Sequence, residues 1–358
     1  IEIASFEWRQ GGQRGDALRV RSKDGAEGVT FCSHTKWRQL PQFFSAIVRP
    51  ALVGRDARAL EEHMANFWRR NFEWTGPALW TAWAHAELAI LDMLGRIANA
   101  PVAELLGGVR RRSVPMYLSS TAREGDPIAE IDAIAQRLRE TGCTGVKVKV
   151  GGRMHFNEDA APNWTPTMIR ESRRRLGSDV TLYADANGSF DAPTAIAVAR
   201  QLEAQAFAMF EEPCPGDDTT MTAQVSRRVR IPIAGGENLA VLPEWRDAMT
   251  GAFDIIQPDP LYSGGMIRCM ALAREAARRG LGFNPHYPRD NAMAAPLVHL
   301  CTAAPTLWGL QEYRMRDIPN DIPHASEYRL VNGAMALVDA PGFGVSIDPD
   351  FWRGATPL

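Results

Sequence analysis

The stretch GVKVKVGG, residues 145–152, decides the fold, because everything depends on which face of this strand is buried. Successive side chains on a strand point to opposite faces, so Lys147 and Lys149 share one face and the valines share the other. Taken alone, the pattern is typical of a half-exposed strand with its lysines in water. The opposite orientation, with the lysines pointing toward a site, requires support from the rest of the chain.

The composition is that of an ordinary globular chain. It has 358 residues, of which 45% are apolar and 23% charged, and its formal net charge is −2. This length allows one large α/β unit with a smaller domain. The small net charge gives no electrostatic reason to expect nucleic acid or an anionic membrane as a partner, so we expect a small-molecule partner.

Cysteine usage and the N-terminus suggest where the protein resides. The five cysteines lie far apart and form no CxxC pair, which argues against a disulfide framework and a structural zinc site. The first ten residues already carry charges and start no apolar core of signal-peptide length. No uncharged apolar stretch of about 18 residues occurs, so we expect a cytoplasmic protein that does not span a membrane.

The first part of the chain predicts a small α+β domain. Residues 1–30 alternate apolar and polar positions around turn signals, which predicts a small antiparallel sheet. Residues 57–71 and 78–98 then have apolar residues at helix spacing. A loop follows, and we expect this domain to cover residues 1–113.

Residues 114–322 show a different, repeating sequence pattern. A short apolar strand that ends in polar residues precedes a longer amphipathic helix, and this pair recurs. There are eight candidate strands, the number that closes a parallel barrel, and the C-terminal ends of barrel strands carry catalytic groups. The polar residues that end the candidate strands are Ser120, Lys149, Asp185, Glu211, Glu237, Asp259, His286 and Glu312.

Three acids on consecutive strands indicate a metal site. Asp185, Glu211 and Glu237 would repel one another at one barrel mouth unless a cation lay among them. Carboxylate oxygens suit Mg²⁺, with Mn²⁺ as a substitute. A single acid at a strand end is as readily explained by exposure to solvent, but three in succession are not. The motif FEEP also contains Glu212, and strand alternation lets only one of its two acids point inward.

The lysines and a histidine supply candidates for proton transfer. In a closed barrel the lysine face of residues 145–151 points inward, which makes Lys149 the expected base. The neighbouring charge of Lys147 and partial burial would both lower the pKa of Lys149 toward the range useful to a base. His286 ends the seventh strand and Asp259 the sixth, and a carboxylate beside an imidazole makes a competent acid/base pair, although a lone histidine is more often structural. Glu312, if protonated, could donate a hydrogen bond to a substrate oxygen that becomes anionic.

Together these groups could catalyse one type of reaction. A metal and a hydrogen-bond donor can stabilise the enediolate that forms when a base removes the proton next to a carboxylate. In a closed barrel we expect Lys149 and His286 to approach the substrate from opposite faces. One can remove the proton while the other either returns one, which inverts the centre, or protonates a departing β-hydroxyl, which eliminates water. Racemisation and dehydration therefore share the same first step.

As an ordered set, these motifs resemble the enolase superfamily and, within it, the mandelate racemase subgroup. The resemblance covers nearly the whole chain, through HAELAILDMLGRIANAPVAELLGG, KVK, DANG, EEP, GEN, PD, NPH and the final QE. It implies a modified TIM barrel of the (β/α)₇β type for residues 114–322, with an N-terminal α+β capping domain that residues 323–358 complete. It also implies a homo-oligomer, usually a dimer or an octamer.

The resemblance implies a role for each matching residue. It favours Glu211 over Glu212 as the metal ligand of the fourth strand, and leaves Glu212 as a supporting or structural acid. It implies that the Mg²⁺ ligands are Asp185, Glu211 and Glu237, that the acid/base groups are Lys149 and the His286–Asp259 pair, that the electrophilic donor is Glu312, and that the supporting positions are Lys147 and Asn187.

Substrate choice is less defined. The loops GGRMHFNEDAAPNWTPT and YPRDNAM match no single activity. Because the N-terminal domain of this superfamily caps the barrel mouth, residues 8–14 and 31–37 are candidate specificity loops. Arg9 and Arg14 could clamp a second anionic or hydroxyl-rich end of the substrate, or lie in a solvated loop instead. His155, in the loop after the lysines, and Asn187 are further candidate substrate contacts.

The leading hypothesis is a Mg²⁺-dependent dehydratase, a hydro-lyase that converts a sugar acid to a 2-keto-3-deoxy acid. A racemase or epimerase of a 2-hydroxy or sugar acid is the near alternative, since it would use the same groups. A non-catalytic ligand-binding barrel is a third hypothesis, against which the complete set of polar positions argues. The sequence does not specify the acid, its stereochemistry or the oligomeric state.

Overall fold

The structure is a computed structural model that describes the chain except residues 11–12, 33–36, 38, 155, 317–323 and 358. Strands β1 (Glu2–Gln10), β2 (Gln13–Arg21) and β3 (Glu27–Phe31) form an antiparallel sheet in the order β15-β1-β2-β3. The antiparallel sheet predicted from residues 1–30 is thus confirmed. Strand β15 (Thr356–Pro357) adds the end of the chain to its edge.

Helix α5 (Pro77–Ala98) joins this sheet to the rest of the protein. It contacts β2 and β3 on one side and barrel helix α12 on the other, and all side chains from Leu79 to Met93 are buried. Proline in its first turn and Asn99 in a left-handed conformation at its end fix its limits. The smaller helices of this region are α2 (Pro41–Phe43), η1 (Phe44–Val48), α3 (Arg49–Leu52), η2 (Ala57–Ala59), α4 (Leu60–Arg70), η3 (Phe72–Trp74) and α6 (Val102–Leu105).

The predicted eight-stranded parallel sheet is confirmed, in the order β10-β9-β8-β7-β6-β5-β4-β11. Its strands are β4 (Ser113–Ser119), β5 (Gly145–Lys149), β6 (Thr181–Asp185), β7 (Met209–Glu211), β8 (Ile233–Gly235), β9 (Ile255–Ile256), β10 (Gly282–Phe283) and β11 (Gln311–Arg314).

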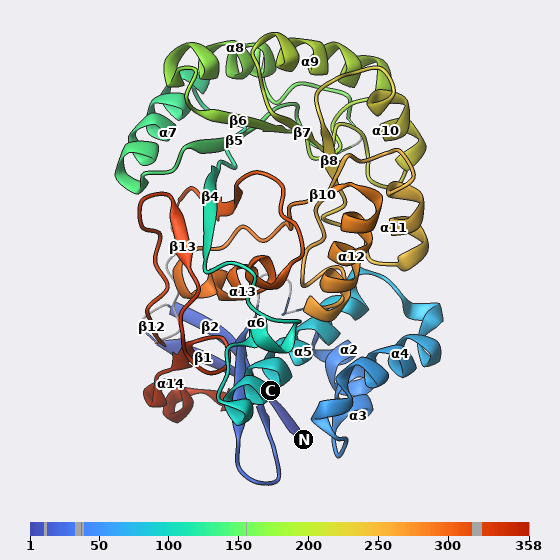
Figure 1. Cartoon of the computed structure of the whole chain (residues 1–358), viewed down its shortest axis with the longest axis vertical. Helices are drawn as coiled ribbons and strands as arrows, with labels where there is room; N and C mark the ends of the chain where they lie inside the picture. Colours follow the sequence, from blue (N-terminus) through green and yellow to red (C-terminus); the bar gives the residue numbers. More distant parts are fainter. Residues whose placement is uncertain (11–12, 33–36, 38, 155, 317–323, 358) are drawn as a thin grey trace.

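Helices alternate with these strands along the chain and cover the outside of the sheet (Figure 1). In the part of the chain that the structure describes, seven of them separate the eight strands, which is the (β/α)₇β arrangement predicted. They are α7 (Pro127–Thr141), α8 (Trp164–Leu176), α9 (Ala192–Ala204), α10 (Thr219–Ser226), α11 (Leu242–Ala248), α12 (Met266–Arg279) and α13 (Ala295–Ala303).

Hydrogen bonds also link β10 to the chain that leads into β11, where the sheet closes on itself. The Trp308 N–H donates to Phe283 O at 2.9 Å. The Asn284 side-chain amide donates to Trp308 O at 3.0 Å and to Leu310 O at 2.7 Å. The chain after β11 returns to the capping region through β12 (His324–Ser326), β13 (Ala334–Ala336), β14 (Val345–Ile347) and α14 (Pro349–Gly354), with β13 pairing antiparallel to the start of β4.

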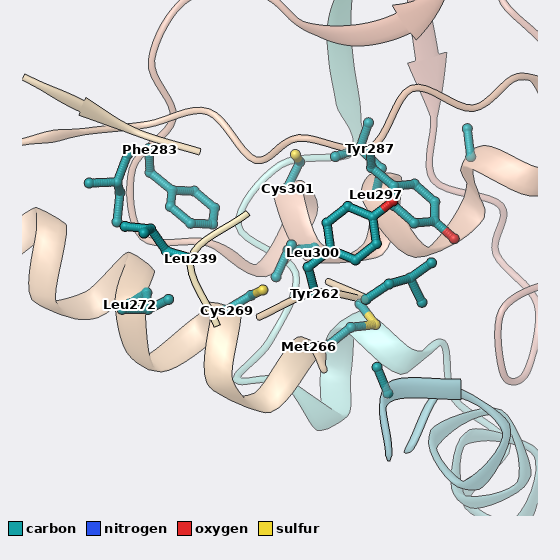
Figure 2. Close-up of a cluster of buried hydrophobic side chains, with 14 of the residues drawn as sticks. Leu239, Tyr262, Met266, Cys269, Leu272, Phe283, Tyr287, Leu297, Leu300 and Cys301 are labelled. Carbon is teal, nitrogen blue, oxygen red and sulfur yellow. The ribbon is translucent and has the colours of Figure 1, made fainter. Parts of the chain in front are cut away.

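Apolar side chains support the mouth of the barrel from the side of α12 and α13. Tyr262 and Tyr287, which follow the ends of β9 and β10, lie in a cluster with Met266, Leu297 and Leu300 (Figure 2). This packing anchors the two segments that carry Asp259 and His286.

Among the described residues, no helix is both long and apolar enough to cross a lipid bilayer.

Candidate active site

Strand register puts three predicted site residues in one row at the C-terminal ends of neighbouring strands. Lys149 on β5 is paired with Asp185 on β6, and Asp185 is paired with Glu211 on β7. Val146 and Val148 on the other face of β5 are fully buried in the main hydrophobic cluster, between the sheet and its helices. The lysine face therefore points into the barrel, as the closed-barrel hypothesis requires.

Lys147 is the central cation of this site. Its side chain is 1% exposed, and its Nζ lies 2.7 Å from Glu211 Oε2, 3.0 Å from Glu312 Oε1 and 3.6 Å from Asp185 Oδ2. Burial opposes its charge, but the charges of Glu211 and Glu312 outweigh burial and hold its pKa well above the ordinary value. Lys147 is thus a counter-ion of the acids, a contact pattern that the spacing of the two lysines alone does not predict.

Lys149 lies nearer the mouth. Its ammonium group forms an ion pair with Asp185 and donates a hydrogen bond to Asn187 Oδ1 at 3.0 Å. The Trp164 indole N–H donates to Lys149 O at 3.1 Å, which holds the end of the strand in place. The Asn187 N–H in turn donates to Asp185 Oδ1 at 2.8 Å. The predicted base and the predicted supporting residue are therefore in direct contact.

Asp185 and Glu211 are both inaccessible to solvent, but their pKa values shift in opposite directions. Burial opposes the charge of Asp185, yet the ammonium groups of Lys149 and Lys147 outweigh it and lower the pKa of Asp185. Burial and the charge of Asp185 raise the pKa of Glu211 to about 7. Glu211 Oε2 accepts hydrogen bonds from Lys147 at 2.7 Å and from Gln257 at 3.0 Å. Its other oxygen, Oε1, is buried and has no partner among the described residues.

His286 lies between two carboxylates. Its Nδ1 is 2.8 Å from Asp259 Oδ2 and its Nε2 is 3.0 Å from Glu237 Oε2. Burial opposes the imidazolium, but the charges of Glu237, Glu312 and Asp259 outweigh burial and raise the pKa of His286 to about 10. The other oxygen of Asp259 accepts the N–H of Leu261 at 2.6 Å, which orients the carboxylate. The predicted His286–Asp259 pair is formed.

Glu312 lies between Lys147 and His286. Burial opposes its charge, but Lys147 and His286 outweigh burial and lower the pKa of Glu312 to about 2. Its Oε2 accepts a hydrogen bond from the Tyr287 N–H at 3.2 Å. Two cations thus face the side chain and favour its charged form, whereas the donor role suggested for Glu312 uses its protonated form; that role stays a prediction.

Glu212 is buried next to the same acids. Burial and the charge of Glu237 raise its pKa well above the ordinary value, its φ is +41°, and its Oε2 has no partner among the described residues. It also borders a cavity of about 450 Å³ that is lined by Met154, Cys214 and Leu239. Of the polar residues named above, only Glu212 lines this cavity within the described part of the chain, so the cavity lies beside the site.

Three candidate substrate contacts cannot be placed. Arg9 and Arg14 are register partners at the end of the β1–β2 hairpin, but their side chains lie outside the described structure. His155 and most of the predicted specificity loop 31–37 also lie outside the described residues. The roles predicted for these residues therefore stay predictions.

Sequence reasoning missed two residues that contact the site. Gln257 donates to Glu211, and it could have been found, because it lies two residues before Asp259 and shares its inward alternation. Arg123 donates to Asn187 Oδ1 at 2.8 Å. It lies in a loop where no periodic pattern applies, so the sequence offers no comparable signal for it.

The acids fit a hard divalent cation in their chemistry but are not preassembled around one. Within the described residues, no three carboxylate, imidazole or thiol side chains converge closely enough to hold a metal ion. Lys149 and His286 contact Asp185 and Glu237 instead. Glu211 has a partnerless buried oxygen, and burial together with the charge of Asp185 raises its pKa to about 7; a bound cation would relieve both. Binding therefore requires Lys149 and His286 to release these oxygens.

Family models match most of the chain. Residues 130–351 match a model described as enolase C-terminal domain-like. Residues 11–107 match the N-terminal domain of mandelate racemase and muconate lactonizing enzyme.

Curated relatives include two dehydratases. D-galactonate dehydratase from Cronobacter sakazakii is 25% identical over 307 residues, which cover 84% of this chain and 80% of the relative. Arabinonate dehydratase from Saccharolobus solfataricus is 26% identical over 307 residues, which cover 84% of this chain and 79% of the relative.

Solved structures share the whole architecture. A protein from Roseobacter denitrificans, described as a "putative racemase", is 29% identical with a TM-score of 0.92, and the match covers 100% of this chain and 99% of that one. A mandelate racemase/muconate lactonizing protein from Paracoccus denitrificans, complexed with magnesium, has the same fold with a TM-score of 0.87 at 24% identity, over 100% of this chain and 98% of that one. The chain therefore belongs to the enolase superfamily and, within it, to the mandelate racemase subgroup.

Proposed function

We propose that this enzyme removes the proton next to the carboxylate of a sugar acid and then eliminates water, which yields a 2-keto-3-deoxy acid. One observation carries the proposal. Two proton-carrying side chains, Lys149 and His286, contact different carboxylates of one acid cluster. They come from β5 and β10, between which four strands intervene on one side of the sheet. A substrate bound at the acids would thus have a proton-transfer group on each side.

In this proposal Asp185, Glu211 and Glu237 hold Mg²⁺, for which Mn²⁺ would substitute. When bound, Mg²⁺ supplies positive charge that stabilises the negative charge developing on the substrate carboxylate. Lys147 stays protonated and keeps Glu211 and Glu312 in place through its contacts at 2.7 and 3.0 Å. These acids then keep fixed positions while charge moves on the substrate.

Lys149 acts as the base. Its neutral amine accepts the proton from the carbon next to the carboxylate, and the electron pair of the broken C–H bond moves into the carbon–carbon bond of the enediolate. The Asn187 side chain holds the lysine in position through the 3.0 Å hydrogen bond. The geometry of this contact matters, because general-base catalysis requires the base within hydrogen-bond reach of the proton.

His286 acts as the acid. Its Nε2–H gives a proton to the β-hydroxyl group as the C–O bond breaks, and the electron pair of that bond leaves with the oxygen as water. Asp259 keeps the Nδ1–H in place through the 2.8 Å contact, so the proton is transferred from Nε2. The enol product then tautomerises to the 2-keto acid. Two curated relatives named for sugar-acid dehydration support this outcome.

A racemase or epimerase is the second candidate. The same two groups would serve it, because His286 would return a proton to the enediolate from the face opposite Lys149. The 29% identical Roseobacter denitrificans protein, which is named for this activity, supports this alternative. The two reactions differ only in whether the second proton goes to carbon or to a leaving hydroxyl group.

Incubation with Mg²⁺ and a panel of acid sugars in deuterated water tests the proposal, beginning with D-galactonate and arabinonate. Formation of a 2-keto-3-deoxy acid supports dehydration, whereas deuterium at an inverted carbon centre supports racemisation. Lys149→Ala and His286→Ala variants serve as controls and should lose turnover. If the parent and a double variant bound acids equally and neither turned over any acid, the proposal would be wrong and a non-catalytic binding barrel would be favoured.

A further inference from the structure

Arg123 is a half-buried cation on the rim of the barrel, in the segment between β4 and α7. Three charged groups face it, namely the carboxylates of Asp185 and Glu237 and the guanidinium of Arg153. It therefore lies at the edge of the acid cluster, although it contacts neither Lys149 nor His286 directly. Its hydrogen bonds show how it nevertheless acts on the site.

The guanidinium group ties three loops together. Its Nε donates to Gly151 O at 3.1 Å, in the loop after β5, and its Nη2 donates to Asn187 Oδ1 at 2.8 Å, after β6. Because the guanidinium is planar, its donors have a fixed relative geometry, so one contact restrains the other. The position of Asn187 thus depends on a residue from the loop after β4.

Asn187 connects Arg123 to Lys149, the proposed base. Its Oδ1 also accepts the Lys149 hydrogen bond at 3.0 Å, and a carbonyl oxygen has two lone pairs, so both are used. Its backbone N–H donates to Asp185 Oδ1, and its φ of +46° is one that asparagine tolerates well. The amide orientation is assigned from these two donors. Its Nδ2 makes no hydrogen bond to any residue in the described part of the chain.

We propose that Arg123 is a positioning residue for the base. It holds the Asn187 carbonyl toward Lys149, which gives the lysine Nζ a fixed acceptor and leaves the Asn187 N–H groups for a substrate oxygen. This inference rests on the proposed function, since it assumes that Lys149 transfers the proton. Without Arg123 the Asn187 amide can rotate, because its terminal torsion has a broad energy minimum. Lys149 then loses its fixed acceptor.

Steady-state kinetics with Mg²⁺ and the acid that the parent turns over test the role. Because a shift of about 1 Å in a reacting group can cost about a hundredfold, Arg123→Met should lower kcat about ten- to a hundredfold and change KM less than about threefold. Arg123→Lys, which keeps one donor, should recover part of the loss. The exposed Arg227 provides a matched control, and Arg227→Met should behave like the parent. Calorimetric Mg²⁺ affinity of Arg123→Met should stay within about threefold of the parent.

A double-variant cycle identifies the route. Arg123→Met combined with Asn187→Ala should be no slower than Asn187→Ala alone, within about threefold, because both changes break the same contact chain. Additive effects would overturn the inference. So would an Arg123→Met variant whose kcat stayed within about threefold of the parent.

Crystal structures of the parent and Arg123→Met with Mg²⁺ alone test the inference without turnover. In the variant the Asn187 amide should rotate, and Lys149 Nζ should lie beyond hydrogen-bond distance, about 3.5 Å, from Oδ1. An unchanged Asn187–Lys149 contact would overturn the positioning role. If the parent turned over no acid, the proposed function would fail, and the crystallographic comparison would still decide whether Arg123 positions Lys149.

Discussion

Replacing Lys147 with methionine is expected to destabilise the protein, because it removes a buried cation and leaves the acids in place. The side chain is 1% exposed, and its Nζ lies 2.7 Å from Glu211 Oε2 and 3.0 Å from Glu312 Oε1. Asp185 Oδ2 is only slightly farther away, at 3.6 Å. Methionine is unbranched and fills nearly the same space, so the change tests charge more than packing.

The expected loss follows from these distances. At an effective dielectric constant of about 20, each of the two shortest contacts is worth about 5 to 6 kcal/mol, and desolvation of the ammonium group offsets several kcal/mol. Removal of one partner of a buried ion pair usually costs about 3 to 5 kcal/mol, and we expect the free energy of unfolding to fall by this amount.

The loss should also depend on pH. Glu211 already has a pKa raised to about 7, and without Lys147 it should rise further. A carboxyl group whose pKa is higher in the folded state than in the unfolded state binds more protons when folded, so stability falls as pH rises. The variant should therefore be less stable at about pH 8 than at about pH 6, relative to the parent.

Urea unfolding of metal-free protein, followed by circular dichroism at both pH values, measures this difference. Lys23→Met, at an exposed lysine, is the matched control and should leave the unfolding midpoint unchanged. A loss of less than about 1 kcal/mol for Lys147→Met at the higher pH would refute the reasoning, because that is the scale of a surface substitution.

Three other measurements address the metal, the acid/base pair and a structural histidine. Calorimetric Mg²⁺ binding should weaken at least about tenfold in each of the variants Asp185→Asn, Glu211→Gln and Glu237→Gln. In Glu212→Gln the Mg²⁺ affinity should change less than about threefold. Equal losses of affinity in Glu211→Gln and Glu212→Gln would contradict the choice of Glu211 as the ligand. Asp259→Asn, which removes the acceptor of His286 Nδ1–H, should lower kcat by about two to four orders of magnitude in steady-state assays without a matching loss of Mg²⁺ affinity. Burial lowers the pKa of His299 to about 3, so the unfolded state binds more protons below the ordinary value of 6.5 and stability should fall by about 2 kcal/mol at about pH 5. Burial also lowers the pKa of His85 to about 3, so both proteins should lose acid-side stability in urea unfolding, and the parent should lose about 2 kcal/mol more than His299→Gln by about pH 5. Parallel pH profiles would contradict the assignment.

The sequence predicted the barrel because local pattern and strand geometry agree. Alternation within a strand separates Lys147 and Lys149 from the valines, and a polar residue at each strand end marks a common height. Register then brings Lys149, Asp185 and Glu211 into a row. The antiparallel sheet of residues 1–30 was predictable for the same reason, since its strands are adjacent in sequence.

Contacts across the barrel could not be predicted in this way. Lys147 and Glu312 come from strands far apart in sequence, and their 3.0 Å contact arises only when β11 lies next to β4. The charge of Glu312 depends on that contact, so a local motif could not reveal it. Arg123 lies in a loop, where side-chain direction follows from tertiary contacts and not from a repeat.

The N-terminal domain also takes part in fixing the proposed acid/base pair, His286 and Asp259, through a buried acid on α5. Glu87 accepts hydrogen bonds from the Trp83 indole at 3.1 Å and from the Ile267 N–H, in the first turn of α12, at 3.0 Å. Burial raises the pKa of Glu87 to about 7 in spite of these donors. Gly265 just before α12 has a φ of +108°, and a Cβ there would lie 2.2 Å from Glu87 Oε1, so only glycine allows the close approach.

These contacts hold the start of α12 against α5. Only a short segment, residues 260–265, separates the start of α12 from Asp259 in the site. Gly265 N–H donates to Pro260 O at 2.8 Å and Ser263 N–H to Asp259 O at 2.8 Å, so the turn between Asp259 and α12 is fixed at both ends. Asp259 in turn contacts His286 Nδ1 at 2.8 Å. An N-terminal domain that folded without packing on the barrel would need no such contact. Because Glu87 anchors the turn that carries Asp259, the orientation of His286 depends on the packing of α5 against the barrel as well as on the barrel strands themselves.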